Sequence, residues 1–185
     1  MTGPSPGLFP LGTNLVTYTA TDQSGNHASC SSTIQVVDTR APHVEVKHTV
    51  TLRSPDHQYR TVDLADCDIE VHDACGGHLD PTASQASITC VTSDEPDDAR
   101  GDDDGHTTND IVIVDSDTVK LRAERDRRGD GRRYQIHFQV RDGSGNRADG
   151  VCSVVVPRDG ECARHPSAPG CRVHGADVAN SVCVP

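Results

Sequence analysis

An acidic stretch between residues 94 and 110 is the part of the sequence best suited to hold a metal ion. Ca²⁺ takes about six to eight oxygen ligands, which carboxylate-rich loops supply. The sequence therefore predicts a calcium site with these candidate ligands: Asp94, Glu95, Asp97, Asp102, Asp104 and Asp110. The spacing does not fit an EF-hand loop, because Gly105 at its sixth position would put Arg100 at the first. The alternative is a solvated acidic loop that pairs with nearby arginines: Arg122, Arg125, Arg127, Arg128, Arg132 and Arg133. Glu124, between two of them, is an expected partner, and such exposed pairs contribute about 0–1 kcal/mol each.

A second group of possible metal ligands lies in the C-terminal tail. Cys162, His165, Cys171 and His174 repeat one Cys-x-x-His spacing, and thiolate with imidazole is typical of zinc sites. Thiolates do not persist in an oxidising compartment. We therefore favour a disulfide-closed tail over a zinc site, with Cys183 as a further member.

The 8 cysteines include no Cys-x-x-Cys pair, which indicates a disulfide-bonded protein of an oxidising compartment. Their spacing suggests three disulfides: Cys67–Cys75, Cys90–Cys152 and Cys162–Cys171. Cys30 and Cys183 are left over in this scheme.

Catalytic motifs are missing from the sequence. It contains no G-x-S-x-G, no H-E-x-x-H and no phosphate-binding G-x-x-x-x-G-K-[ST]. His57, beside Pro55 and Asp56, is the one histidine of interest, and we expect a turn residue bonded to nearby backbone. The sequence gives no reason to expect an enzyme.

Composition excludes several classes of protein. The chain has 185 residues, a net charge of -11 and 3% aromatic residues. The negative charge argues against nucleic acid or an anionic membrane surface as a partner. No stretch approaches the roughly 18 consecutive apolar residues that span a bilayer. A protein or cell-surface partner is compatible with the sequence, which does not specify the oligomeric state.

The elements that position these residues are expected to be short strands. A hairpin pattern around Asp-x-Ser-Gly-Asn occurs twice, at Asp22 and at Asp142, where Gly allows the positive φ of a tight turn. Alternation predicts that one set of residues faces a core: Tyr134, Ile136, Phe138 and Val140. We expect strands at 43–51, 58–64, 67–71, 86–92, 111–115, 118–123, 133–141 and 148–156.

This strand count predicts an all-β fold, an immunoglobulin-like antiparallel β-sandwich over residues 43–158. Residues 1–42 have room for only the last strands of a second sandwich and a linker, so we expect a truncated module there. Residues 159–185 are expected to form a poorly ordered tail with Cys and Pro. The N-terminus lacks the features of a signal peptide, which favours a fragment or a start further upstream.

A family resemblance supports this division. The residues that carry it are Phe9-Pro10-Leu11-Gly12-Thr13, Tyr18-Thr19-Ala20, Asp22, Ser24-Gly25-Asn26 and Cys30. This segment, about residues 7–38, resembles the C-terminal half of the hyalin repeat (HYR) domain, an extracellular immunoglobulin-like module. Residues 43–158 resemble a module that follows such repeats in large secreted bacterial proteins, on Pro55-Asp56-His57, Thr108-Asn109-Asp110-Ile111 and Gly129-Asp130-Gly131. The resemblance implies extracellular, multidomain architecture and no particular activity.

Two functions are compatible with these features. The first is a non-catalytic extracellular module that serves as a spacer, adhesion or protein-interaction domain of a secreted or surface protein. The alternative is an accessory module of a secreted hydrolase, which binds or spaces substrate for another domain. Neither requires a cofactor, apart from the calcium considered above.

Overall fold

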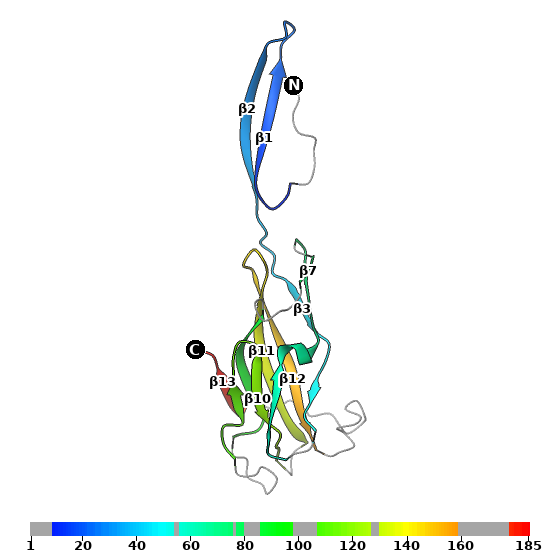
Figure 1. The fold of residues 1–185 in the computed structure, drawn as a ribbon, viewed down its shortest axis with the longest axis vertical. Coiled ribbons are helices and arrows are strands. Elements are labelled where there is room, and N and C mark those ends of the chain that lie inside the picture. The colour runs from blue at the N-terminus through cyan, green and yellow to red at the C-terminus, as the bar shows by residue number, and fades with distance from the viewer. Residues whose placement is uncertain are drawn as a thin grey trace. The chain divides into compact units, whose positions relative to one another are not determined.

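The computed structural model divides the chain into two compact units, residues 1–40 (unit 1) and residues 41–185 (unit 2). The structure describes residues 9–53, 56–75, 77–79, 86–97, 107–126, 130–158 and 178–185. Its described elements are strands, apart from the 3-10 turn η1 (Leu64–Cys67) (Figure 1). The expected all-β fold is confirmed.

Unit 1 is built around one antiparallel hairpin, β1 (Gly12–Thr21) and β2 (His27–Val36). At its turn, Oδ1 of Asp22 accepts hydrogen bonds of 2.8 Å from the amides of Ser24 and Asn26. A side-chain bond from Asn26 helps to hold the pKa of Asp22 below its usual value. Asp142 makes the same contacts in unit 2, so the repeated motif forms the same turn twice, as the sequence predicted.

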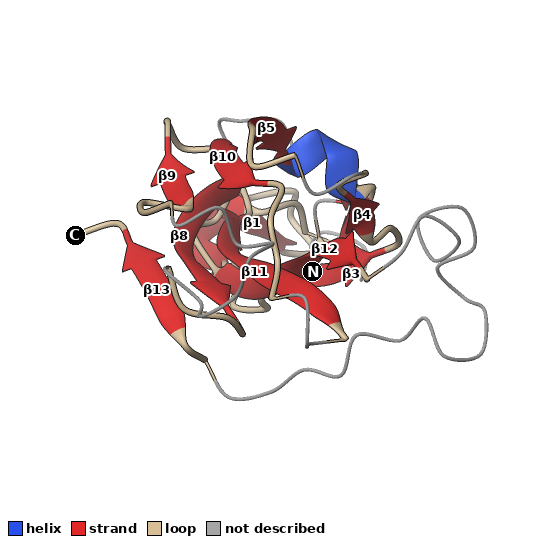
Figure 2. Cartoon of the chain, turned by 90° about the horizontal axis from the view of Figure 1, so that it is seen from below, coloured by secondary structure: helices blue, strands red, loops and turns tan. Residues whose placement is uncertain are grey.

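The strands of unit 2 form three sheets. The largest has the order β13 (Asn180–Cys183), β8 (Ala86–Ser93), β11 (Gly131–Arg141), β12 (Arg147–Pro157) and β4 (Val50–Thr51). The second has the order β5 (Tyr59–Asp63), β10 (Thr118–Arg122) and β9 (Ile111–Ile113), and the third has the order β3 (His43–Val46), β6 (Ile69–Asp73) and β7 (Gly77–Leu79). Pairing is antiparallel except between β12 and β4. In the view along the strands, β9, β10 and β5 lie on one side of β8, β11 and β12 (Figure 2). This is the layered arrangement of a β-sandwich.

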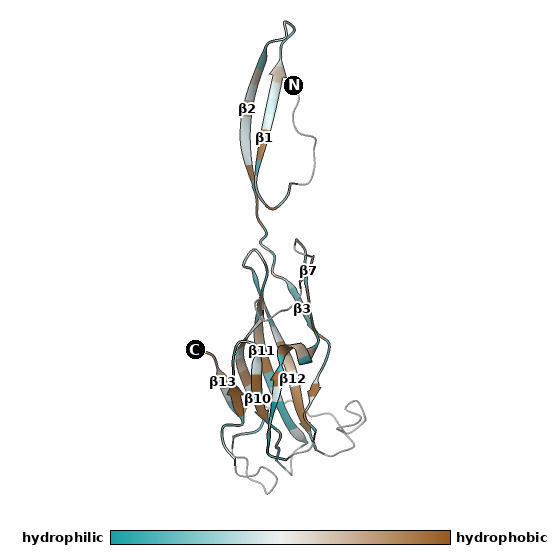
Figure 3. Ribbon diagram, viewed as in Figure 1, coloured by the Kyte–Doolittle hydropathy of each residue, from teal (hydrophilic) through white to brown (hydrophobic). Residues whose placement is uncertain are grey.

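The core of unit 2 follows from alternation along its long strands. Tyr134, Ile136, Phe138 and Val140 of β11 are at most 1% exposed, whereas Gln135 and its odd-numbered neighbours are half-buried. The predicted inward face is therefore confirmed. Colouring by hydropathy shows apolar residues along the strands of unit 2, while β1 and β2 are mostly paler (Figure 3). Ser and Thr, which fill much of the hairpin, account for this difference.

Position 150 of β12 has room only for glycine, because the ring of Phe138 lies over it. It pairs with Phe138 of β11, and a Cβ added at residue 150 would lie 2.3 Å from Cζ of that ring. Because Phe138 is buried, its ring has little space to move. Gly150→Ala is expected to lower the free energy of unfolding by about 1–3 kcal/mol, measured by urea denaturation. Gly143→Ala is the matched control, since nothing lies within 4 Å of a Cβ there; an equal loss in both variants would contradict the contact.

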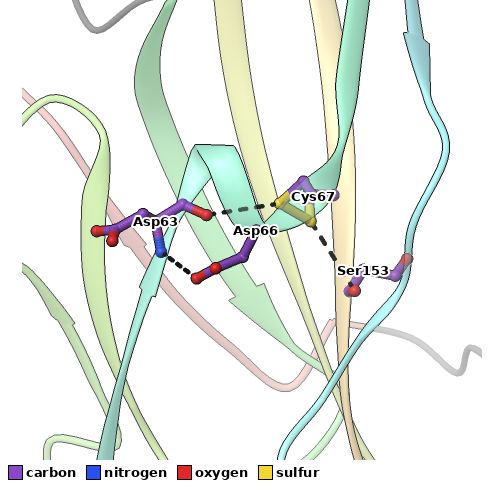
Figure 4. Close-up of a disulfide and its surroundings, with 5 residues drawn as sticks. Asp63, Asp66, Cys67 and Ser153 are labelled. Atoms are coloured by element: carbon purple, nitrogen blue, oxygen red, sulfur yellow. Dashed lines mark hydrogen bonds between the residues drawn. A yellow bond between two sulfur atoms is a disulfide. The ribbon is translucent and has the colours of Figure 1, made fainter.

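The disulfides differ from the expected pairing. Cys67 of η1 bonds Cys152 of β12, and Cys90 of β8 bonds Cys183 of β13. The Cys67–Cys75 and Cys90–Cys152 pairs are therefore wrong. Cys67 bonds a distant strand instead of closing the short loop to Cys75, and this leaves Cys90 to pair with Cys183 of β13. Figure 4 shows Cys67 at the end of η1, whose turn is held by a 2.9 Å bond from the amide of Asp63 to Oδ2 of Asp66. Cys30 is exposed and free, and Cys162 and Cys171 lie outside the described residues.

The end of the tail is also more ordered than expected. Asn180–Cys183 forms β13, which pairs with the edge of β8. The flanking amides of Ala179 and Val184 donate to Ser93 and Thr89 at 2.8 and 2.9 Å. The expectation of a poorly ordered tail is thus wrong for these residues. β7 was not expected either, and the predicted strand at 43–51 is two strands, β3 and β4.

Candidate functional site

Four charged residues of unit 2 form a cluster, which we call the buried charge cluster: Asp110, Arg122, Glu124 and Arg132. The side chains of Asp110, Glu124 and Arg132 are fully buried, and that of Arg122 is 15% exposed. Two guanidinium groups balance two carboxylates, which is the condition under which buried charge is tolerated.

Strand pairing brings these residues together. Leu121 of β10 pairs with Ile111 of β9, so Arg122 lies opposite Asp110, and its amide donates to the Asp110 carbonyl at 2.9 Å. Arg132 is the second residue of β11 and follows Gly131, which has φ of 115°. Glu124 follows the end of β10. The cluster thus joins residues at the ends of both layers of the sandwich.

Arg132 occupies the centre of the buried charge cluster. Its Nη1 lies 2.7 Å from Oδ2 of Asp110 and 3.5 Å from Oε1 of Glu124. Its Nε donates to Oγ of Ser93 at 2.9 Å, and its Nη2 donates to the Pro96 carbonyl at 2.9 Å. The guanidinium also lies 4.9 Å from the centroid of the Tyr134 ring. These contacts satisfy the charge and hold the chain after β8 against β11.

Arg122 ties the cluster to two other loops. Its Nη1 donates to the His57 carbonyl at 2.9 Å, and its Nη2 donates to the Thr108 carbonyl at 3.2 Å. Its guanidinium lies 4.1 Å from the centroid of the Tyr59 ring, a cation–π geometry. Its carbonyl accepts a 2.8 Å bond from the hydroxyl of Tyr134, whose pKa burial raises well above its usual value. The cluster therefore organises one end of unit 2.

His57 lies beside this cluster in the conformation of a turn. It has φ of 60°, and its amide donates to the Ala123 carbonyl at 3.2 Å, which confirms the expected backbone bond. Its Nδ1 lies 3.5 Å from Oε2 of Glu124, a contact that the sequence did not predict.

The predicted calcium ligands that the structure describes are engaged in internal contacts. Oδ1 of Asp97 accepts from the amide of Asp110 at 2.9 Å and from Nδ2 of Asn180 at 2.8 Å, while its Oδ2 accepts from the amide of Asn109 at 2.8 Å. Oδ1 of Asp94 accepts from the amide of Arg133 at 2.8 Å. Glu95 and Asp110 are engaged as well, with the amide of Asp126 and with Arg132. Asp102 and Asp104 lie outside the described residues.

Calcium binding by this loop stays a prediction. The hypothesis predicts that millimolar CaCl₂ raises the melting temperature of the full chain, because a ligand that binds the native state stabilises it. Thermal melts in CaCl₂, MgCl₂ and NaCl of equal ionic strength measure this effect. Equal melting temperatures in all three salts would contradict the hypothesis.

Glu95 makes the stability of the folded protein depend on pH. Burial raises its pKa from 4.5 to about 7, against the lowering effect of the bond from the Asp126 amide. The folded state therefore holds a proton that the unfolded state releases above about pH 4.5, so the contribution of this group to stability falls as pH rises towards 7. Glu95→Gln is expected to be more stable than the wild type at pH 8 by about 1–2 kcal/mol, after allowance for screening by solvent, with less difference at pH 4.5.

Urea denaturation at both pH values measures this effect. Glu45→Gln is the control, because the Lys47 hydrogen bond lowers the pKa of Glu45 and its replacement should not stabilise the protein at pH 8. The difference in stability between Glu95→Gln and the wild type should be larger at pH 8 than at pH 4.5. An equal or smaller difference at pH 8 would contradict the prediction.

The sequence-based expectation of exposed arginines is wrong for Arg132, and the small energy of an exposed ion pair does not apply to Glu124. Composition suggested exposure, since charged residues are seldom fully buried unless paired. A usable signal was nevertheless present. Arg132 is in phase with Tyr134, Ile136, Phe138 and Val140, so extending the same alternation by one step places it on the core face.

Among the described residues, no helix has the length and apolar composition needed to cross a membrane.

Comparison with known proteins gives a partial match. Residues 1–36 match the HYR domain family. The sushi, von Willebrand factor type A, EGF and pentraxin domain-containing protein 1 of Rattus norvegicus is 52% identical over 40 residues, which are 22% of this chain and 1% of that protein; the Mus musculus protein gives the same values. Hyalin of Lytechinus variegatus is 39% identical over 89 residues, 46% of this chain and 14% of hyalin.

These matches correct one expectation and extend another. The bacterial setting expected from the sequence is wrong, since the similar proteins come from eukaryotes. The chain spans about 1% of the first relatives and 14% of hyalin. An alignment over 46% of the chain exceeds the 40 residues of unit 1 and must include part of unit 2. The chain thus carries an HYR match in unit 1 and a similarity to hyalin that continues beyond it.

Proposed function

We propose that the chain is a non-catalytic extracellular β-sandwich module, which serves as a spacer, adhesion or protein-interaction domain of a larger secreted or surface protein. The observation that carries the proposal is the HYR match at residues 1–36, together with the longer similarity to hyalin. An immunoglobulin-like module that repeats along large extracellular proteins is suited to spacing and contact.

The disulfides support an extracellular setting. Cys67–Cys152 and Cys90–Cys183 both join strands or turns of the sandwich, so they belong to its folded framework. Such structural disulfides are typical of secreted proteins, whereas cytosolic thiols are kept reduced.

The placement of charge supports a non-catalytic role. Catalytic acids and bases need access to a substrate atom. Asp110 and Glu124 are instead fully buried and paired with Arg132, and Asp97 is bonded to the amides of Asn109 and Asp110. These carboxylates therefore stabilise loops rather than face a substrate.

The hairpin of unit 1 supports a role in protein contact. Register places Val16, Tyr18 and Ile34 on one face, while Thr17 and Thr33 lie on the other. Tyr18 and Ile34 are 39% and 36% exposed. Exposed apolar side chains on a strand pair favour association with another protein surface.

The experiment is a cell-attachment assay on surfaces coated with the oxidised full chain. Cells should attach, and soluble chain should compete. Tyr18→Asp/Ile34→Asp should reduce attachment, whereas Thr17→Asp/Thr33→Asp, on the opposite face of the same hairpin, should not. Circular dichroism spectra of both variants confirm that the sheets are intact.

Two outcomes would contradict the adhesive role. The first is equal attachment to the wild type and to Tyr18→Asp/Ile34→Asp. The second is retention of the chain on insoluble polysaccharides without attachment of cells, which would favour an accessory module of a hydrolase.

A further inference from the structure

The outer face of the β3–β6 strand pair carries two histidines that none of the roles above uses. Along β3 and β6, Val44 and Val46 pack against the core cluster, which includes Ile69 and Val71. Alternation therefore places the other residues of these strands on the outer face. His43 and His72 are exposed there.

The registers align the histidines across adjacent strands. His43 of β3 pairs with His72 of β6, and His72 pairs with His78 of β7. Residues directly opposite in an antiparallel pair share a face of the sheet, with Cβ atoms about 4.5–5.5 Å apart. From these directly opposite positions, the exposed imidazoles of His43 and His72 can reach one metal ion, which sits about 2.0–2.1 Å from each ligating nitrogen.

Two carboxylates lie on the same face, next along the strands. Glu45 pairs with Glu70, and Oε2 of Glu70 lies 3.7 Å from Nε2 of His72. Lys47 lies 2.7 Å from Glu45 and 3.4 Å from Glu70. The Lys47 hydrogen bond holds the pKa of Glu45 below its usual value, with a contribution from the nearby His43 and His72. The face thus offers imidazoles beside ionised carboxylate.

We propose that this face binds Zn²⁺, with His43 and His72 as ligands and Glu70 as the adjacent carboxylate. Imidazole nitrogen with carboxylate oxygen is a donor set typical of zinc, whereas Ca²⁺ takes oxygen ligands alone. These residues are different from those of the acidic loop and from the cysteines and histidines of the tail motif.

Titration of the oxidised full chain with ZnCl₂, followed by calorimetry, tests the proposal. The wild type should bind Zn²⁺ and gain melting temperature from it. His43→Ala/His72→Ala should weaken binding by about tenfold or more. In NMR spectra, the ring signals of His43 and His72 should shift on addition of Zn²⁺, while those of His27 should not.

Two control variants separate this site from other histidines. His27→Ala removes an exposed strand histidine of unit 1 that bonds Thr21. His165→Ala/His174→Ala removes the alternative ligands in the tail. Both should bind Zn²⁺ as the wild type does. Unchanged binding by His43→Ala/His72→Ala, or loss of binding only in the tail variant, would overturn the proposal. Melting curves without metal confirm that the double variant is folded.

Discussion

Replacing Arg132 with methionine is expected to lower the free energy of unfolding of unit 2 by about 3–5 kcal/mol. Methionine keeps much of the side-chain volume but removes the charge that faces Asp110 at 2.7 Å and Glu124 at 3.5 Å. Both carboxylates would remain fully buried, with Arg122 as their nearby cation. An unbalanced charge in a buried site costs far more than the loss of an exposed ion pair.

Urea denaturation followed by circular dichroism measures this loss. Arg147→Met is the matched control, because Arg147 is exposed on β12, and its replacement should change stability by less than about 0.5 kcal/mol. The triple variant Arg132→Met/Asp110→Asn/Glu124→Gln should recover part of the loss, since it removes the buried carboxylates too. A loss in Arg132→Met no larger than that in Arg147→Met would show that the cluster is not buried as described.

Removing the Cys67–Cys152 disulfide is expected to lower the free energy of unfolding by about 4–5 kcal/mol. The disulfide closes a sequence separation of 85 residues. In the chain-entropy model, a cross-link over about this length restricts the unfolded chain by about 4.5 kcal/mol. Both cysteines are fully buried between η1 and β12, so a Cys67→Ala/Cys152→Ala variant also loses packed sulfur.

Guanidinium denaturation of the non-reduced protein measures this effect. Cys30→Ala is the control, because Cys30 is exposed and free, and the variant should unfold with the wild type. Cys90→Ala/Cys183→Ala should lose a similar entropic contribution without the packing loss, since Cys183 is exposed and holds only the short β13. A Cys67→Ala/Cys152→Ala variant as stable as wild type would contradict the prediction.

The sequence predicted the long elements of this fold well. Alternation along residues 133–141 identified the inward face of β11, and the Asp-x-Ser-Gly-Asn pattern identified both hairpin turns. These features are local, because the turn is held by side-chain bonds to nearby backbone and the alternation follows from the geometry of one strand.

The features that the sequence did not predict depend on contacts between distant segments. β13 is a strand of four residues that forms against the edge of β8. The disulfide partners lie 85 and 93 residues apart, so spacing along the chain favoured closer and incorrect pairs. The pairing of His43 with His72 likewise follows only from the register of β3 and β6.

The two disulfides interleave along the chain, in the order Cys67, Cys90, Cys152 and Cys183. When force pulls on the chain ends and the sandwich unfolds, tension runs from Cys67 to Cys90 and crosses directly to Cys183. The separation of 93 residues between Cys90 and Cys183 then adds no length to the fully extended chain. At about 3.4 Å per residue, this withholds roughly 30 nm of extension that reduction would release. Oxidised, unit 2 is a short tether even after its sheets have separated.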